Sequence, residues 1–235
     1  MSSSVQSAVV SRIPGSAALG LVAPPSAVRV PAVAFADPAW TAAVLDQRAA
    51  REGTGDRRVV ATLWWYSASS VLLTPPLAGL LTGVPLSARL GDLTVSVLPS
   101  LVPIAAESNG PGSGEAAADL RSTLGAVVAA VAEAGRMRER PLWAIATDSL
   151  ADRLLALGRA TGDVGRATAL AAPLAAAVGA ALPVPRYEDV GGARFVRRAS
   201  CCLLYRVPAG SMCTSCPRRL PAERLALLER AAGRW

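Results

Sequence analysis

The residues of this chain that could do chemistry gather near its C-terminus. Its four cysteines are Cys201, Cys202, Cys213 and Cys216, in the pattern C-C-x10-C-x2-C. Thiolates grouped this closely indicate a metal centre. The chain has no His, and all 24 of its basic residues are Arg. These absences exclude a Ser-His-Asp triad, a Cys-His dyad, a histidine-bound metal and a lysine Schiff base.

The spacing of the cysteines leaves three interpretations open. Structural zinc is the metal that four clustered cysteines most often bind, but its cysteine ligands usually come as two C-x2-C-like pairs. Here one pair is replaced by the neighbours Cys201 and Cys202, whose side chains point in different directions. A 2Fe–2S cluster suits that arrangement better, because each of its two irons takes two thiolates. Disulfides or free thiols are the third interpretation, and a disulfide between neighbours is strained.

The residues around the cysteines resemble a known family. The string R-x-S-C-C-L-x-Y-R-x-P-x-G-x-x-C-x-x-C-P-R begins at Arg198 and ends at Arg218. It is similar to the C-terminal signature of the ferric siderophore reductases of the FhuF type, a 2Fe–2S family. Outside the cysteines, the matching positions include Tyr205, Pro208, Gly210 and Pro217. A weaker resemblance extends upstream, over the segments 64–66, 76–77, 83–85 and 143–154.

The resemblance implies a function and a cofactor. Cys201, Cys202, Cys213 and Cys216 would bind a 2Fe–2S cluster, and the protein would be an oxidoreductase acting on ferric siderophores. Hard anionic oxygens hold Fe(III) far better than Fe(II), so one electron releases the iron as Fe(II). No proton-transfer residue is needed, which fits a chain without His. Because no G-x-G-x-x-G motif follows a strand, we expect an external electron donor, either a ferredoxin or a flavin reductase.

Two other functions stay open at this stage. One is a structural zinc-binding module, and the other is an electron-transfer or iron-sensing 2Fe–2S protein that does not act on siderophores. Candidate substrate-binding residues are of two kinds. Arginines beside the cysteines would attract an anionic ferric siderophore or donor, or would simply form a solvated face. Aromatic rings would stack on the siderophore, or would pack in the core. The candidates are Arg197, Arg198, Arg206, Trp64 and Trp65.

Charge and hydropathy limit the partners. The net charge is +7, but there is no basic run interleaved with aromatics, so we expect no nucleic-acid binding. Residues 59–88 carry no charge, yet prolines and glycines interrupt them, so we expect no transmembrane segment. The first residues make a poor signal peptide, and we expect a cytoplasmic protein. Peripheral association with a membrane stays open.

Composition and periodicity predict an α+β fold. Apolar residues make up 52% of the chain and aromatics only 4%, which favours closely packed helices. We expect a mostly helical body with a small β-sheet and a C-terminal cysteine-rich iron–sulfur segment. Three regions are predicted: a poorly ordered or extended lead-in over 1–36, the reductase-like body over 37–190, and the cluster-binding segment with a terminal helix over 191–235.

Local signals predict the individual elements. We expect Pro75 and Pro76 to end a helix that begins near Val59, and Asp148 to cap the start of another helix. In the terminal helix after Pro221, Leu225 and Leu228 should face inward. Further predictions are helices over 38–53, 76–81, 115–138 and 163–181, and over 90–104 a strand or a hairpin arm broken at Pro99.

Overall fold

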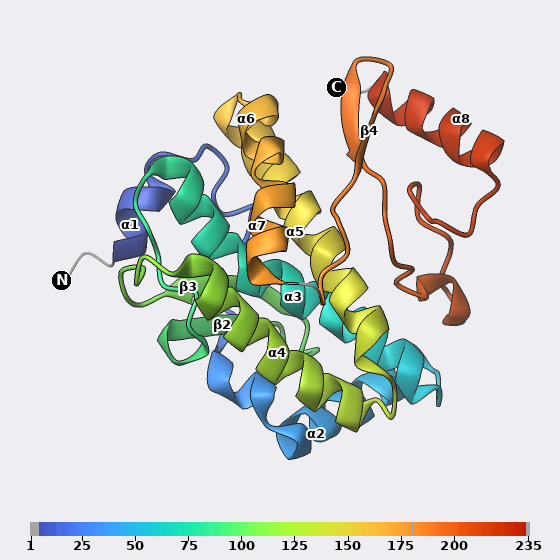
Figure 1. The fold of residues 1–235 in the computed structure, drawn as a ribbon. Helices are drawn as coiled ribbons and strands as arrows, with labels where there is room; N and C mark the ends of the chain where they lie inside the picture. The colour runs from blue at the N-terminus through green and yellow to red at the C-terminus, as the bar shows by residue number, and fades with distance from the viewer. Residues whose placement is uncertain (1–4, 180, 234–235) are drawn as a thin grey trace.

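A computed structural model describes residues 5–179 and 181–233 of the chain, and this part is mostly helical (Figure 1). It confirms the predicted α+β class, with antiparallel strands in two small sheets. The elements before the C-terminal segment are α1 (Val5–Val10), β1 (Val28–Pro31), α2 (Pro38–Glu52), α3 (Arg57–Thr82), β2 (Leu93–Val97), β3 (Pro103–Ser108), α4 (Ala116–Ala134), α5 (Glu139–Thr161), α6 (Val164–Ala169) and α7 (Ala171–Val178).

The long helix α3 forms the centre of the core and packs against α5 and strand β3. The prediction that Pro75 and Pro76 end this helix was wrong, because both lie inside it and the helix continues to Thr82. The prolines remove two N–H donors, and the Thr74 hydroxyl donates 2.8 Å to the carbonyl of Ser70 one turn earlier. Burial of this stretch on all sides outweighs the local preference to stop. The helix ends at Gly83, whose φ of 72° is left-handed.

The N-terminal region, where the sequence predicts a poorly ordered or extended lead-in, contains helix α1 and strand β1 and packs on the small sheet over residues 5–36. Strand β1 pairs antiparallel with β2, and β2 pairs antiparallel with β3, so the region expected to be one strand or a broken hairpin arm holds two paired strands. The buried Gln6 amide donates to the carbonyls of Leu21 and Ala106 at 2.8 and 3.1 Å and accepts from the Ser108 N–H at 2.7 Å. The proline-rich composition hid these long-range contacts. Residues 1–4 lie outside the described residues.

Helix α5 crosses α3 and begins earlier than predicted, at Glu139. Asp148 therefore lies in the middle of the helix and does not cap it, which corrects the prediction. Beyond α5, the single helix expected over 163–181 is two short helices, α6 and α7. Pro173 has no N–H to donate to the carbonyl of Ala169, so the first of them cannot continue unbroken.

The C-terminal part lies along one side of the helical body (Figure 1). It begins with a hairpin of β4 (Tyr187–Val190) and β5 (Ala193–Val196), continues as an irregular segment, and ends in α8 (Pro221–Ala232). The hairpin spans residue 191, where the sequence suggested a boundary. Arg224 of α8 pairs with Glu188 of β4 at 2.8 Å. Leu228 is buried as predicted, but Leu225 is 47% exposed, so the prediction that it faces inward was wrong.

Among residues 5–179 and 181–233, no helix combines the length and the apolar character needed to cross a bilayer.

The close approach of α3 to the chain after it gives a testable prediction. A Cβ on Gly79 would lie 2.7 Å from the Val84 carbonyl oxygen and 2.8 Å from the Leu86 nitrogen, whereas one on Gly125 of α4 would meet the Trp143 ring at 3.9 Å. Gly79→Ala should lower the free energy of unfolding by about 1–3 kcal/mol, because backbone has to move. Gly125→Ala should raise it by up to about 1 kcal/mol through helix propensity. Urea unfolding monitored by circular dichroism measures both, and equal effects would contradict this packing.

Candidate metal centre

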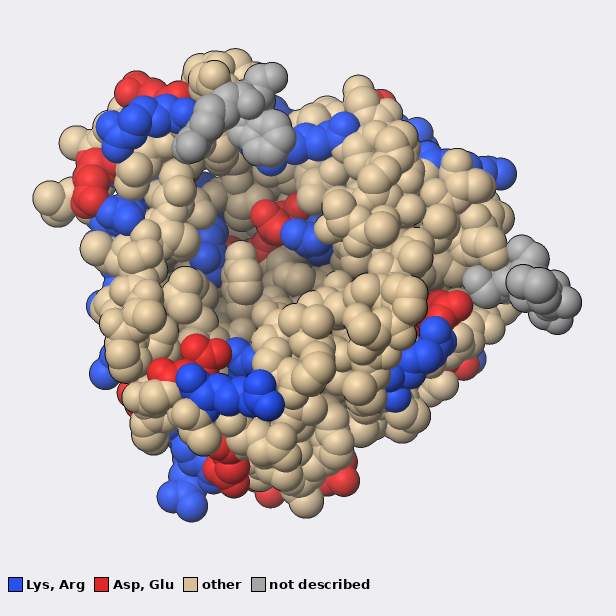
Figure 2. All heavy atoms as spheres, turned by 180° about the vertical axis from the view of Figure 1, so that it is seen from behind, with Lys and Arg blue, Asp and Glu red and all other residues tan. Residues whose placement is uncertain are grey.

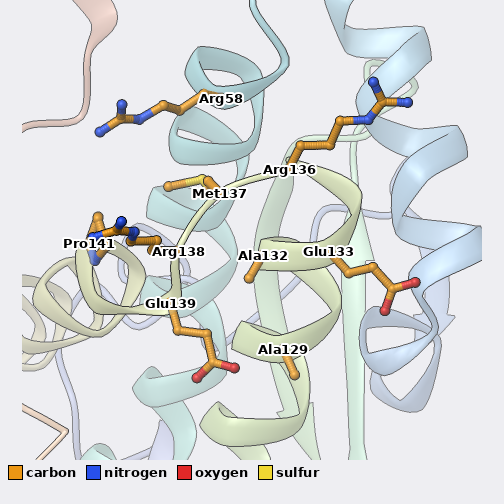
Figure 3. A pocket seen from close by; sticks show the side chains of 9 residues that line it. All are labelled: Arg58, Ala129, Ala132, Glu133, Arg136, Met137, Arg138, Glu139 and Pro141. Atoms are coloured by element: carbon orange, nitrogen blue, oxygen red, sulfur yellow. The ribbon is translucent and has the colours of Figure 1, made fainter.

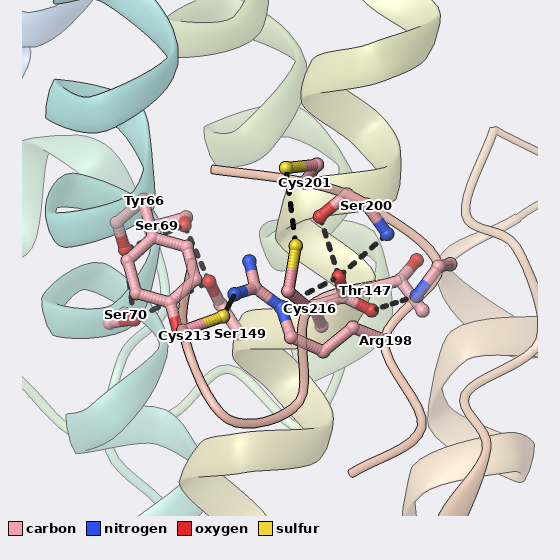
Figure 4. Close-up of polar contacts among 12 residues, drawn as sticks. Tyr66, Ser69, Ser70, Thr147, Ser149, Arg198, Ser200, Cys201, Cys213 and Cys216 are labelled. Atoms are coloured by element: carbon pink, nitrogen blue, oxygen red, sulfur yellow. Dashed lines mark hydrogen bonds and ion pairs between the residues drawn. The ribbon is translucent and has the colours of Figure 1, made fainter. Parts of the chain in front are cut away.

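The four cysteines lie on the irregular segment between β5 and α8, which packs against α3 and α5 (Figure 4). Leu203 and Val207 of this segment are buried against Val59 near the start of α3, with Cys201 and Tyr205 beside them. This apolar contact fixes the stretch directly after Cys202 on the body. It also removes part of the surroundings of Cys201 from water.

A buried carboxylate fixes the start of the cysteine segment. Asp148, only 4% exposed, accepts from the Ala199 N–H at 2.8 Å, from the Ser200 N–H at 2.9 Å and from the Ser200 hydroxyl at 2.5 Å. Arg198 adds an ion pair at 3.5 Å. A buried charge is tolerated only when its oxygens are satisfied in this way. One helical side chain thus holds the three residues that lead into Cys201.

The path between the cysteines depends on two unusual backbone positions. Leu203, directly after Cys202, has a left-handed φ of 62°. At Gly210 a Cβ would lie 1.8 Å from the carbonyl oxygen of Leu204, so only glycine fits there. A turn closed by the Cys216 N–H on the Cys213 carbonyl at 3.1 Å then brings the last two cysteines together. These positions explain why Gly210 belongs to the motif.

The thiols form two pairs. The sulfurs of Cys201 and Cys216 are 3.9 Å apart, and Cys213 donates a hydrogen bond to Cys202. All four cysteines are free thiols. Among the residues that the structure describes, no group of three or more His, Cys, Asp or Glu side chains could hold a single metal ion. Each of the close pairs combines one neighbour from Cys201-Cys202 with one member of the C-x2-C pair.

A buried arginine lies against one of these pairs. The Arg198 side chain is 6% exposed, and its Nη1 donates 3.4 Å to the sulfur of Cys213. Its guanidinium stacks 4.7 Å over the ring of Tyr66 on α3 (Figure 4), and its Nε faces Asp148 at 3.5 Å. Nη2 is also buried and has no hydrogen-bond partner in the described part of the chain. The arginine therefore presents a spare donor next to the cysteines.

The pairs differ in their protonation. The hydrogen bond from Cys213, assisted by a backbone N–H of Leu204 and by Arg198, lowers the pKa of Cys202 to about 5. The same hydrogen bond, with burial, raises the pKa of Cys213. Burial followed by the charge of Cys216 raises the pKa of Cys201. A thiolate is the form that binds metal, and the structure makes one readily available at Cys202.

The other predicted site residues are exposed or contact partners other than the sulfurs. Arg197 is exposed, and Arg206 is exposed and pairs with Asp56 at 3.5 Å. Trp64 and Trp65 are 1% and 0% exposed, and their indole N–H groups donate to the carbonyls of Leu101 and Leu142. Neither ring offers a face to a ligand at the surface. Their consecutive positions in a buried helix account for this, because core packing surrounds α3 on all sides.

Two residues that complete the site were not predicted for it. Asp148 was assigned to a helix start and Tyr66 to the aromatic segment as a whole. A signal for Asp148 does exist in the sequence. It is the only acidic residue between Glu139 and Asp152. Of the four residues three or four positions away, Ala144, Ile145 and Ala151 are apolar, and only Asp152 is charged. An acid on the apolar face of a helix has to find a buried partner.

Elsewhere in the described part of the chain, charged side chains and hollows are spread over the surface. Basic and acidic side chains are interspersed on the face seen in Figure 2, which has a hollow near its middle containing both. A large open hollow of about 1090 Å³ lies at the turn between α4 and α5. Its arginines diverge, with Arg136 directed away from Arg58 and Arg138 (Figure 3). A smaller one, of about 300 Å³, borders the cysteine segment and is lined by Asp148, Arg186, Arg197 and Arg198 among others.

The comparison with known families decides the nature of the centre. Residues 198–218 match the FhuF 2Fe-2S C-terminal domain. The match begins at Arg198 and includes every cysteine of the chain. It confirms the predicted resemblance for this segment, and it identifies the cofactor as a 2Fe–2S cluster. No curated protein matches the chain.

The anchor at Asp148 gives the second prediction. Asp148→Asn should lower the free energy of unfolding by about 3 kcal/mol, because the amide cannot accept from all its present donors and leaves Arg198 without its partner. The matched control is Asp152→Asn, one turn along α5. The side chain of Asp152 is 42% exposed and pairs with Arg153. That change should cost under about 1 kcal/mol.

Urea unfolding gives the free energies, and amide exchange of residues 199–216 locates the effect. Faster exchange there is expected in Asp148→Asn alone. Unchanged exchange at these amides would contradict the anchoring role of Asp148.

Proposed function

We propose that this protein reduces the ferric iron of siderophore complexes and releases it as Fe(II) in the cytoplasm, with Cys201, Cys202, Cys213 and Cys216 as the ligands of its cluster. The observation that carries the proposal is the 2Fe–2S domain match over 198–218, in which these cysteines are the only thiols. The arrangement of the sulfurs in two close pairs supports a centre with two irons, each of which takes two thiolates.

The surrounding residues fit such a group chemically. Four thiolates bring a large negative charge, and the buried guanidinium of Arg198 is placed to offset part of it. The partnerless Nη2 of Arg198 is a donor for a further sulfur acceptor. When bound, a 2Fe–2S cluster accepts and passes on one electron at a time. The apolar packing of Leu203 and Val207 excludes water from one side of the thiols.

The electron balance of the proposed reaction needs an outside donor. A reduced ferredoxin or flavin reductase loses one electron, and one Fe(III) in the siderophore complex becomes Fe(II). The hard oxygen ligands of the siderophore hold Fe(II) weakly, so the metal leaves without proton transfer by the protein. Arg197 and Arg206 are exposed and lie four residues from Cys201 and Cys202, respectively, in the sequence, and Arg186 and Arg197 line the adjoining hollow of about 300 Å³. Their charge would favour an anionic complex or an acidic donor.

The test of this function uses anaerobically purified protein. We expect two irons and two acid-labile sulfides per chain, bleaching by dithionite, and rapid reoxidation by ferric hydroxamate or catecholate complexes, with Fe(II) trapped by a ferrous chelator. Protein that contains zinc without sulfide would overturn the cofactor assignment. Reduced protein that no ferric complex in the panel reoxidises would instead indicate an electron carrier or iron sensor.

Replacement of single cysteines tests the ligand assignment. Each of the four Cys→Ser variants should lose the cluster or bind it with a changed visible spectrum, since oxygen donates differently from thiolate. Ser215→Ala, within the same C-x2-C turn, is the control and should keep full iron and sulfide content. A Cys→Ser variant with the wild-type spectrum and iron content would remove that residue from the ligand set.

A further inference from the structure

We propose that Cys201 and Cys216 hold one iron and Cys202 and Cys213 the other, and that Arg198 makes the iron of Cys202 and Cys213 the one that takes the electron. This proposal rests on the function proposed above and deepens it. It assigns a pairing within the ligand set, and it gives a buried arginine a positioning and tuning role at the site.

The pairing follows from the distances between thiols. In a tetrahedral centre with metal–sulfur bonds of about 2.3 Å, two sulfurs on the same metal lie about 3.8 Å apart. The sulfurs of Cys201 and Cys216 are already 3.9 Å apart. Cys202 and Cys213 are joined by their own hydrogen bond. Pairing of the neighbours Cys201 and Cys202 on one iron would break both contacts and pull against the left-handed turn at Leu203.

Electrostatics then distinguishes the two pairs. Each pair accepts one backbone N–H, from Leu203 at Cys201 and from Leu204 at Cys202, so backbone hydrogen bonds do not distinguish the pairs. The difference is Arg198, whose Nη1 donates 3.4 Å to Cys213. Cys201 lies instead in the apolar cluster with Leu203 and Val207. A reducing electron adds negative charge, which is stabilised next to a buried cation and disfavoured in apolar surroundings.

The position of Arg198 is fixed from both sides, so the difference in charge between the two cysteine pairs is a stable property of the fold. Asp148 on α5 faces its Nε at 3.5 Å, and the ring of Tyr66 on α3 lies 4.7 Å from its guanidinium carbon. Asp148 separately binds the N–H groups of Ala199 and Ser200. The loop therefore keeps its anchor when the arginine side chain is changed, and variants of Arg198 can be compared in a folded protein.

The first experiment measures the midpoint potential of the holoprotein by redox titration. Arg198→Met, which keeps the bulk but loses the charge and donors, should make reduction about tenfold less favourable, equal to 59 mV for a one-electron couple. Arg198→Lys retains the charge without the planar fork and should give a smaller decrease. The control is Arg218→Met, which removes an exposed charge two residues after Cys216 and should give less than half the decrease of Arg198→Met. A decrease in Arg198→Met no larger than this control would overturn the role of Arg198.

The second experiment assigns the irons in ⁵⁷Fe-enriched, dithionite-reduced protein by Mössbauer spectroscopy. Serine at Cys202 or Cys213 should alter the ferrous component of the spectrum, and serine at Cys201 or Cys216 the ferric component. The reverse assignment, or one component altered by both Cys201 and Cys202, would overturn the proposal. The titration uses variants with all their cysteines, so it remains decisive if a serine variant fails to bind iron. Neither experiment contains siderophore, so their outcome is separate from the test of ferric siderophore reduction.

Discussion

The buried carboxylate of Asp148 is the interaction on which the site depends. A charge that is 4% exposed requires donors, and three of them come from the backbone and hydroxyl of Ala199 and Ser200. The fourth is Arg198, whose other end reaches the sulfur of Cys213. One side chain in the middle of a helix therefore positions both the start of the cysteine segment and the cation beside it. The irregular segment acquires a fixed geometry from the rigid helices beneath it.

Those helices are held together independently of the segment. The Ser69 hydroxyl of α3 lies 2.7 Å from that of Ser149, the neighbour of Asp148 on α5, and joins the helices directly beneath the site. Apolar contacts of α3 supply the rest: Val59 holds the segment, while Leu72, Leu73 and Leu77 fill the core further along. A helical scaffold that is stable without the cysteine segment suits an electron-transfer centre, because ligands on a rigid scaffold need little rearrangement when the charge changes.

The cofactor of the site could be predicted from the sequence more accurately than the helices that position it. Cysteine spacing and the residues around it are local, and they sufficed to predict the cofactor that the domain match identifies. The predicted helix end at Pro75 and Pro76 was wrong because burial of α3 outweighs the local stop signal. The predicted cap at Asp148 was wrong because an aspartate can either cap a helix or bind buried donors, and the residue type does not distinguish these roles. The contacts of Gln6 with Ala106 and Ser108 join positions about a hundred residues apart, which no local pattern reveals. The direction of Arg198 is equally a property of the fold, since Tyr66 and Asp148 together determine it.

The central claim is that this fold holds two irons between two pairs of cysteines beside a buried arginine. Diffraction at the iron absorption edge, from crystals of anaerobically prepared protein, tests it most directly. We expect two iron peaks, one between Cys201 and Cys216 and one between Cys202 and Cys213, with Arg198 next to the second. A single metal peak shared by the cysteines, or an iron between Cys201 and Cys202, would contradict it.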